Sequence, residues 1–108
     1  MHIVQTASCH SLADTFVDNF SSNEKSIADA IVDQTALRKE TLIPLIKKTG
    51  GNGWIALNDE IKTAQEMAKK HARLSISPNS ALSIVGLMQA IYTGKSWDGT
   101  VACMICGD

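Results

Sequence analysis

The stretch Gly53-Trp54-Ile55-Ala56-Leu57-Asn58-Asp59-Glu60 joins a short apolar run to the start of a helix. Residues 53–57 are predicted to form a strand, because the run is short, apolar and bounded by turn residues. Asn58 is a preferred residue at helix N-termini, and the acidic residues after it suit the positive end of the helix dipole. One helical face then carries Ile61, Ala64, Met67, Ala68 and His71.

The same alternation of strand and helix extends toward the N-terminus. Residues 3–7 are predicted to form a strand and residues 12–20 a helix, since apolar side chains recur at helical spacing in the second segment. Residues 40–48 predict a further helix, which Gly50-Gly51 can end. The apolar segment 27–32 is too short to classify by its period, and we expect a loop or a short helix on the core.

Toward the C-terminus, Pro78-Asn79-Ser80 predicts a turn and the start of a helix that runs up to Gly94. The apolar run 100–106 is then predicted to be a buried strand with Cys106 at its end. Strands alternating with helices indicate an α/β fold with a parallel (βαβ) sheet flanked by helices. Ligands gather beyond the carboxyl ends of such strands, and Gly107 would let one approach the backbone there.

Composition limits the class of protein. With 108 residues and 44% hydrophobic content, residues 1–108 are expected to form a single domain or a fragment of one. The formal charge of -1 leaves no basic stripe, so we expect neither nucleic acid nor a membrane as a partner. No run is long enough to span a bilayer and no signal peptide is evident, so a cytoplasmic protein is expected.

The three cysteines do not follow the spacing of a disulfide-stapled fold, so we expect reduced thiols. Cys103 and Cys106 match the C-x-x-C pattern of redox pairs and half zinc sites. If they lie in a strand, as predicted, side chains three residues apart point to opposite faces, which argues against both uses. Buried cysteine behaves mainly as a small apolar residue, and Cys103 is expected in the core.

Several local patterns, taken in order, resemble the C-terminal half of fold-type II pyridoxal-phosphate enzymes, with threonine synthases the most similar group. The resemblance covers nearly the whole chain, although each motif alone is weak. Its motifs are Val4-Gln5-Thr6-Ala7 with the helical pattern after it, Lys25-Ser26-Ile27-Ala28-Asp29-Ala30-Ile31, Lys48-Thr49-Gly50-Gly51, Asn58-Asp59-Glu60-Ile61, Ile76-Ser77-Pro78-Asn79-Ser80-Ala81-Leu82 and Ile105-Cys106-Gly107-Asp108.

The resemblance implies that the chain is part of the large domain of such an enzyme. The parent reaction would convert O-phosphohomoserine and water to threonine and phosphate, on a pyridoxal phosphate cofactor. Family members hold the cofactor through a lysine and a phosphate-binding loop that are both encoded upstream of the part represented here. No lysine of this sequence matches the Schiff-base position and no glycine-rich phosphate loop precedes a helix, so the chain alone is not expected to be catalytic.

The resemblance also assigns residues to the cofactor. Cys106 falls where family members place a Ser, Thr or Cys against the pyridine nitrogen, with Gly107 beside it, and residues Ala28, Asp29 and Ala30 would line the ring. A neutral thiol cannot stabilise a fully protonated pyridinium, which favours elimination or replacement over transamination. The sequence departs from most threonine synthases at Cys106, at Ser77 in place of glutamate and at Asp108 in place of histidine. The thiol also resembles the serine/threonine dehydratase branch.

A different class of function stays open beside the enzyme. The chain can also be a non-enzymatic α/β module that binds a small ligand or a partner through an exposed sheet edge. Because a truncated parallel sheet exposes apolar surface, the expected partners are the missing N-terminal half of an enzyme or a second copy of the chain.

Overall fold

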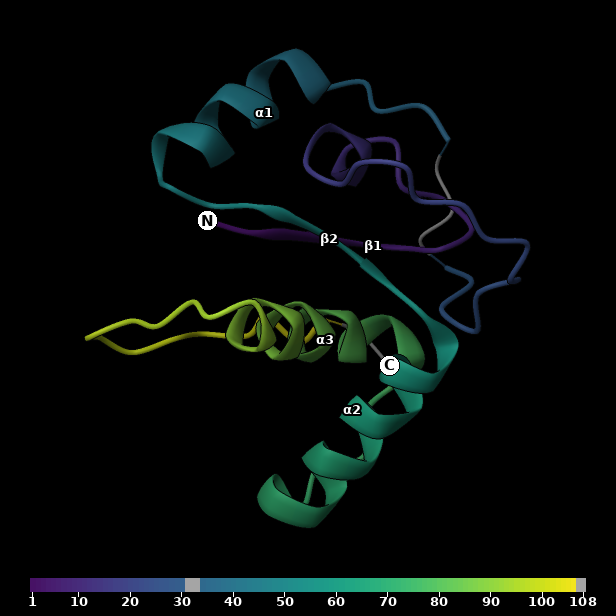
Figure 1. Cartoon of the computed structure of the whole chain (residues 1–108). Coiled ribbons are helices and arrows are strands. Elements are labelled where there is room, and N and C mark those ends of the chain that lie inside the picture. Colours follow the sequence, from purple (N-terminus) through teal and green to yellow (C-terminus); the bar gives the residue numbers. More distant parts are fainter. Residues whose placement is uncertain (31–33, 107–108) are drawn as a thin grey trace.

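The computed structural model describes residues 1–30 and 34–106 as a layered α/β arrangement (Figure 1). Strands β1 (Ile3–Thr6) and β2 (Gly53–Ala56) lie in the middle. Helix α1 (Lys39–Lys48) and the short 3-10 helix η1 (Ala13–Thr15) lie on one side of them. Helices α2 (Asn58–Ala72) and α3 (Pro78–Tyr92) lie on the other. The predicted α/β class is confirmed at this coarse level.

The two strands pair in parallel, as predicted, in the register Ile3 to Gly53 through Thr6 to Ala56. The alternation of side chains along β2 explains why both faces are covered. Ala56 belongs to the core cluster shared with α2 and α3, whereas Ile55 packs with Ala7 and Ala13 on the opposite face. Gly53 lies beneath Phe16, and a Cβ there would be 2.7 Å from the Phe16 ring.

The predicted start of α3 and the predicted end of α1 are confirmed, although the cap of α3 is Ser77 and not one of the residues 78–80. Ser77 accepts a hydrogen bond from the Ser80 backbone at 3.2 Å and Pro78 occupies the first turn of α3. Gly50 ends α1 with a φ of +70°, and the backbone amide of Gly51 donates to the Ile46 carbonyl at 2.9 Å. This is a Schellman ending, for which glycine is favoured because it lacks a Cβ.

The predicted helix over residues 12–20 is wrong, since only Ala13–Thr15 forms a helix there. Its N-terminus lacks a side-chain cap from Leu12, and Asn19 takes a left-handed φ of 56°, which a continuous helix cannot contain. The apolar spacing had a different cause. Val17 and Phe20 pack from a loop onto the cluster of Ala7, Ala13 and Ile55.

The predicted terminal strand is also wrong. Residues 100–106, called the tail below, form neither helix nor strand. A strand requires a neighbour for its backbone groups, and the described part of the sheet consists of β1 and β2 paired with each other. The tail instead lies against α3, with Val101, Met104 and Ile105 exposed. Within residues 1–30 and 34–106, no helix is long and apolar enough to cross a membrane.

Candidate functional site at the carboxyl edge of the sheet

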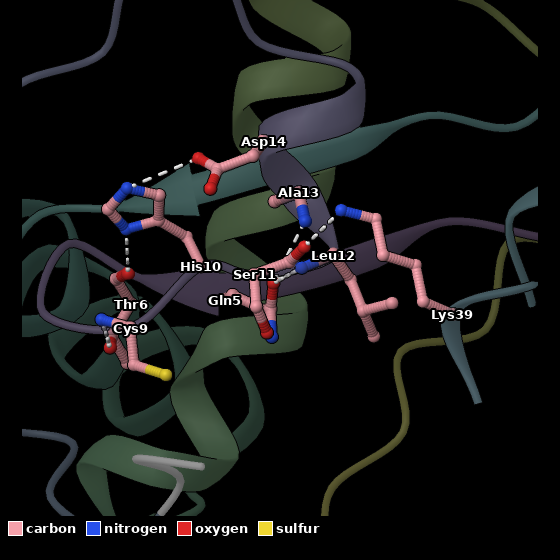
Figure 2. Close-up of polar contacts among 9 residues, drawn as sticks. All are labelled: Gln5, Thr6, Cys9, His10, Ser11, Leu12, Ala13, Asp14 and Lys39. Atoms are coloured by element: carbon pink, nitrogen blue, oxygen red, sulfur yellow. Dashed lines mark hydrogen bonds and ion pairs between the residues drawn. The ribbon is translucent and has the colours of Figure 1, made fainter. Parts of the chain in front are cut away.

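The turn after β1 is fixed by one side chain of that strand. The amide oxygen of Gln5 accepts hydrogen bonds from the backbone amides of Leu12 and Ala13, both at 2.8 Å (Figure 2). The residue before η1, Leu12, has no side chain that could cap this short helix. Gln5, which lies in β1, supplies the hydrogen-bond acceptor instead. The Lys39 ammonium donates to the Ser11 carbonyl at 2.9 Å and ties the start of α1 to the same turn.

The residues directly after β1 form a second set of contacts (Figure 2). The Cys9 amide donates to the Thr6 hydroxyl at 3.2 Å, and His10 Nδ1 donates to the Thr6 carbonyl at 3.1 Å. His10 Nε2 lies 3.3 Å from the Asp14 carboxylate, and the ring meets Phe20 edge to face. Both ring nitrogens thus face oxygen atoms of the chain, so His10 fastens the turn after β1.

The segment 24–30 is held against the carboxyl ends of both strands. After β1, the Ser8 hydroxyl accepts from the Ser26 amide at 2.6 Å. After β2, Asn58 makes three bonds to the segment: its side-chain oxygen accepts from the Ile27 amide at 2.9 Å, its side-chain amide donates to the Lys25 carbonyl at 2.9 Å, and its backbone amide donates to the Glu24 carboxylate at 3.0 Å. For the apolar segment 27–32 we expected a loop or a short helix; residues 27–30 form a loop, and residues 31–32 lie outside the described residues.

Two of the residues assigned to the cofactor are each hydrogen-bonded to the start of α3. The Ala30 amide donates to the Asn79 side-chain oxygen at 3.3 Å, and the hydroxyl of the next residue, Ser80, donates to the Cys106 carbonyl at 3.0 Å. Segments that are 76 residues apart in sequence are thereby joined to consecutive residues of one helix. The fold brings them together at the edge where open α/β sheets hold ligands.

The other assigned residues have different surroundings. Ala28 is fully buried in the core cluster of α2 and α3, so its side chain serves packing. Asp29 is exposed beside Ala30. Cys106 is exposed too, at the end of an irregular segment and not at the end of a strand. Gly107 lies outside the described residues.

The cysteine geometry removes one premise of the sequence argument. Because the tail is not a strand, alternation of faces does not govern Cys103 and Cys106. Cys103 is partly buried, its thiol lies 3.6 Å from the Ser83 carbonyl, and burial raises its pKa. Among the described residues, no group of three or more His, Cys, Asp or Glu side chains is placed to hold a metal ion.

Sequence reasoning missed Ser8, Asn58 and Asn79 as the residues that assemble this edge. Asn58 and Asn79 were recognisable as helix-start residues, but their side chains serve a distant segment instead of their own helices. A polar side chain directly after a strand or at a helix start is the available signal. A scan against protein-family models found no match, and a search of curated proteins also found none.

Proposed function

We propose that this chain supplies one side of the cofactor site of a cytoplasmic, threonine synthase-like, pyridoxal-phosphate-dependent lyase. One observation carries the proposal: the two segments that the resemblance assigns to the cofactor, ending at Ala30 and Cys106, are both bonded to the first turn of α3. Nothing in the local sequence of either segment requires this meeting. It is the arrangement that a shared ligand would need.

The residues present fit the pyridine end of the cofactor. Ser80 bonds the carbonyl of Cys106, which leaves the exposed thiol able to donate a hydrogen bond to an aromatic nitrogen. Pyridoxal phosphate would supply an electron sink for elimination at the substrate. Cys106 would orient the ring and keep its nitrogen from full protonation, while Asn79 and Ser80 would hold the two segments in register. The Schiff-base lysine and the proton transfers would come from an N-terminal half of the enzyme.

The proposal is tested by complementation. The chain is mixed with the N-terminal half of a characterised threonine synthase and with pyridoxal phosphate, and phosphate release from O-phosphohomoserine is followed. We expect release from the mixture and from neither half alone, with a lower rate for Cys106→Ala. Cys103→Ala is the matched control, because its thiol contacts Ser83 outside the site. Deamination of serine or threonine without phosphate release would indicate the dehydratase branch instead.

A simpler measurement can contradict the proposal. The chain alone is incubated with pyridoxal phosphate and reduced with borohydride, and the labelled residues are identified by mass spectrometry. Stoichiometric labelling of one defined lysine would show a complete cofactor site and overturn the assignment of that lysine to another part. Equal activity of Cys106→Ala and the unmodified chain in the complemented enzyme would remove Cys106 from the site.

A further inference from the structure

A cavity of about 430 Å³ separates β1 from the tail. Val4 lines it from β1, Leu87 and Ala90 from α3, and Val101 and Met104 from the tail. None of the side chains that line this cavity is a carboxylate, a lysine or an arginine. His2, Ser83 and Thr100 also line it, so the space is suited to an uncharged and mostly apolar segment of chain.

The tail has the direction of a sheet strand but not the pairing of one. Cys103 lies at Ser83 and Cys106 at Ser80, so the tail runs antiparallel to α3. The strand that follows the helix in a βαβ unit runs in this direction. These two contacts to α3 hold the tail on the side of the cavity opposite β1. To pair with β1 of the same chain, the tail would have to break both contacts.

Neither side of the cavity is protected against strand addition. Exposed strand edges are ordinarily blocked by charged residues, proline or bulges. The tail, Thr100-Val101-Ala102-Cys103-Met104-Ile105-Cys106, contains no charge and no proline, and β1 reads Ile3-Val4-Gln5-Thr6. Exposure of Val101 is 43%, of Met104 77% and of Ile105 41%. A short, uncharged, β-prone and apolar segment of this kind readily pairs with a strand edge.

We propose that this cavity receives the tail of a second copy of the chain. Both complementary parts, the uncharged β1 edge and the uncharged tail, belong to one sequence, so two copies can satisfy each other about a two-fold axis. In each copy, the tail of the partner would lie between β1 and that copy's own tail. The two tails would then be neighbours and would pair antiparallel at the two-fold axis. The result is strand addition, which joins two small sheets into one. This inference rests on the fold and is independent of the proposed cofactor.

The test measures the mass of the full chain by light scattering over a range of concentrations, without pyridoxal phosphate. We expect a dimer, and we expect Met104→Lys to weaken it more than tenfold, because the lysine charge would be buried in the apolar cavity. The exposure of Met104 in the single chain lets this variant keep its fold, which circular dichroism checks. Leu37→Lys is the control, since Leu37 is 88% exposed and does not line the cavity.

Hydrogen exchange supplies a second readout on the same samples. In the proposed dimer the amides of residues 101–105 gain protection as concentration rises, because they enter a strand ladder. A chain that stays monomeric up to about 1 mM would overturn the inference. So would a dimer whose tail amides exchange freely, or one that both lysine variants weaken equally. Failure of the cofactor complementation would leave these results unchanged, so the two proposals fail separately.

Discussion

The contact between Gly86 of α3 and Val4 of β1 offers the sharpest test of the packing. A Cβ added at Gly86 would lie 2.2 Å from Val4 Cγ2, well inside van der Waals contact. Replacing a helical glycine by alanine ordinarily stabilises by about 1 kcal/mol, whereas forcing extra atoms into an occupied space costs roughly 1–3 kcal/mol. We therefore expect Gly86→Ala to lower the free energy of unfolding by up to about 2 kcal/mol.

The second substitution, Val4→Ala, removes the obstructing methyl groups. Alone it should cost roughly 1–2 kcal/mol through lost burial of two carbon groups. In that background Gly86→Ala meets less resistance, so its effect should change sign and stabilise by up to about 1 kcal/mol.

Urea unfolding of the four chains, followed by tryptophan fluorescence and circular dichroism, gives the cycle. Trp54 is a suitable reporter, because it is 8% exposed and lies 3.6 Å from the added Cβ. Gly99→Ala is the control for a glycine with open space around it. Equal stabilisation by Gly86→Ala in both backgrounds would refute the close approach of α3 to β1.

Three further predictions concern polar contacts. His2 Nδ1 accepts from the Trp54 indole and the Asn52 amide, both at 3.1 Å, and burial, aided by the positive N-terminus and Lys95, lowers the pKa of His2 below 6.5. The unfolded chain therefore binds more protons below pH 6.5, so the free energy of unfolding should fall as the pH drops from 6.5 toward the folded pKa of His2. Urea titrations at several pH values should show that His2→Asn removes this part of the pH dependence. Gln5→Ala should cost roughly 1–3 kcal/mol in urea unfolding, because it leaves two amides of the η1 turn without their acceptor. Ser77→Ala should cost about 1 kcal/mol through loss of the α3 cap, measured the same way.

The Gln5 and Ser77 predictions each have a matched control. Gln5→Glu keeps an acceptor oxygen and should retain most of the stability that Gln5→Ala loses. Ser77→Asp keeps a capping side chain, while the exposed Ser75 can be replaced by alanine with little effect. An unchanged pH dependence in His2→Asn, or equal losses for the paired Gln5 or Ser77 variants, would contradict the contacts on which the predictions depend.

Local sequence signals determined a large part of the secondary structure. The starts of α2 and α3, the glycine ending of α1 and the parallel strands β1 and β2 were all predictable, because period, caps and turn residues act within a few positions. The failures have one physical origin. The apolar pattern over residues 12–20 and the apolar run 100–106 specify burial, but a pattern of burial does not state the backbone conformation that achieves it.

Tertiary structure decided the rest. Gln5 selected a compact turn where a helix was predicted, since its side chain satisfies the amides that begin η1. The tail forms no strand, because strand formation depends on a neighbour that can hydrogen-bond to it. The meeting of Ala30 and Cys106 at α3 depends on contacts over 49 and 26 positions. The sequence by itself determined which residues favour burial, helix starts and turns, and only the folded chain decided which distant segments share an edge.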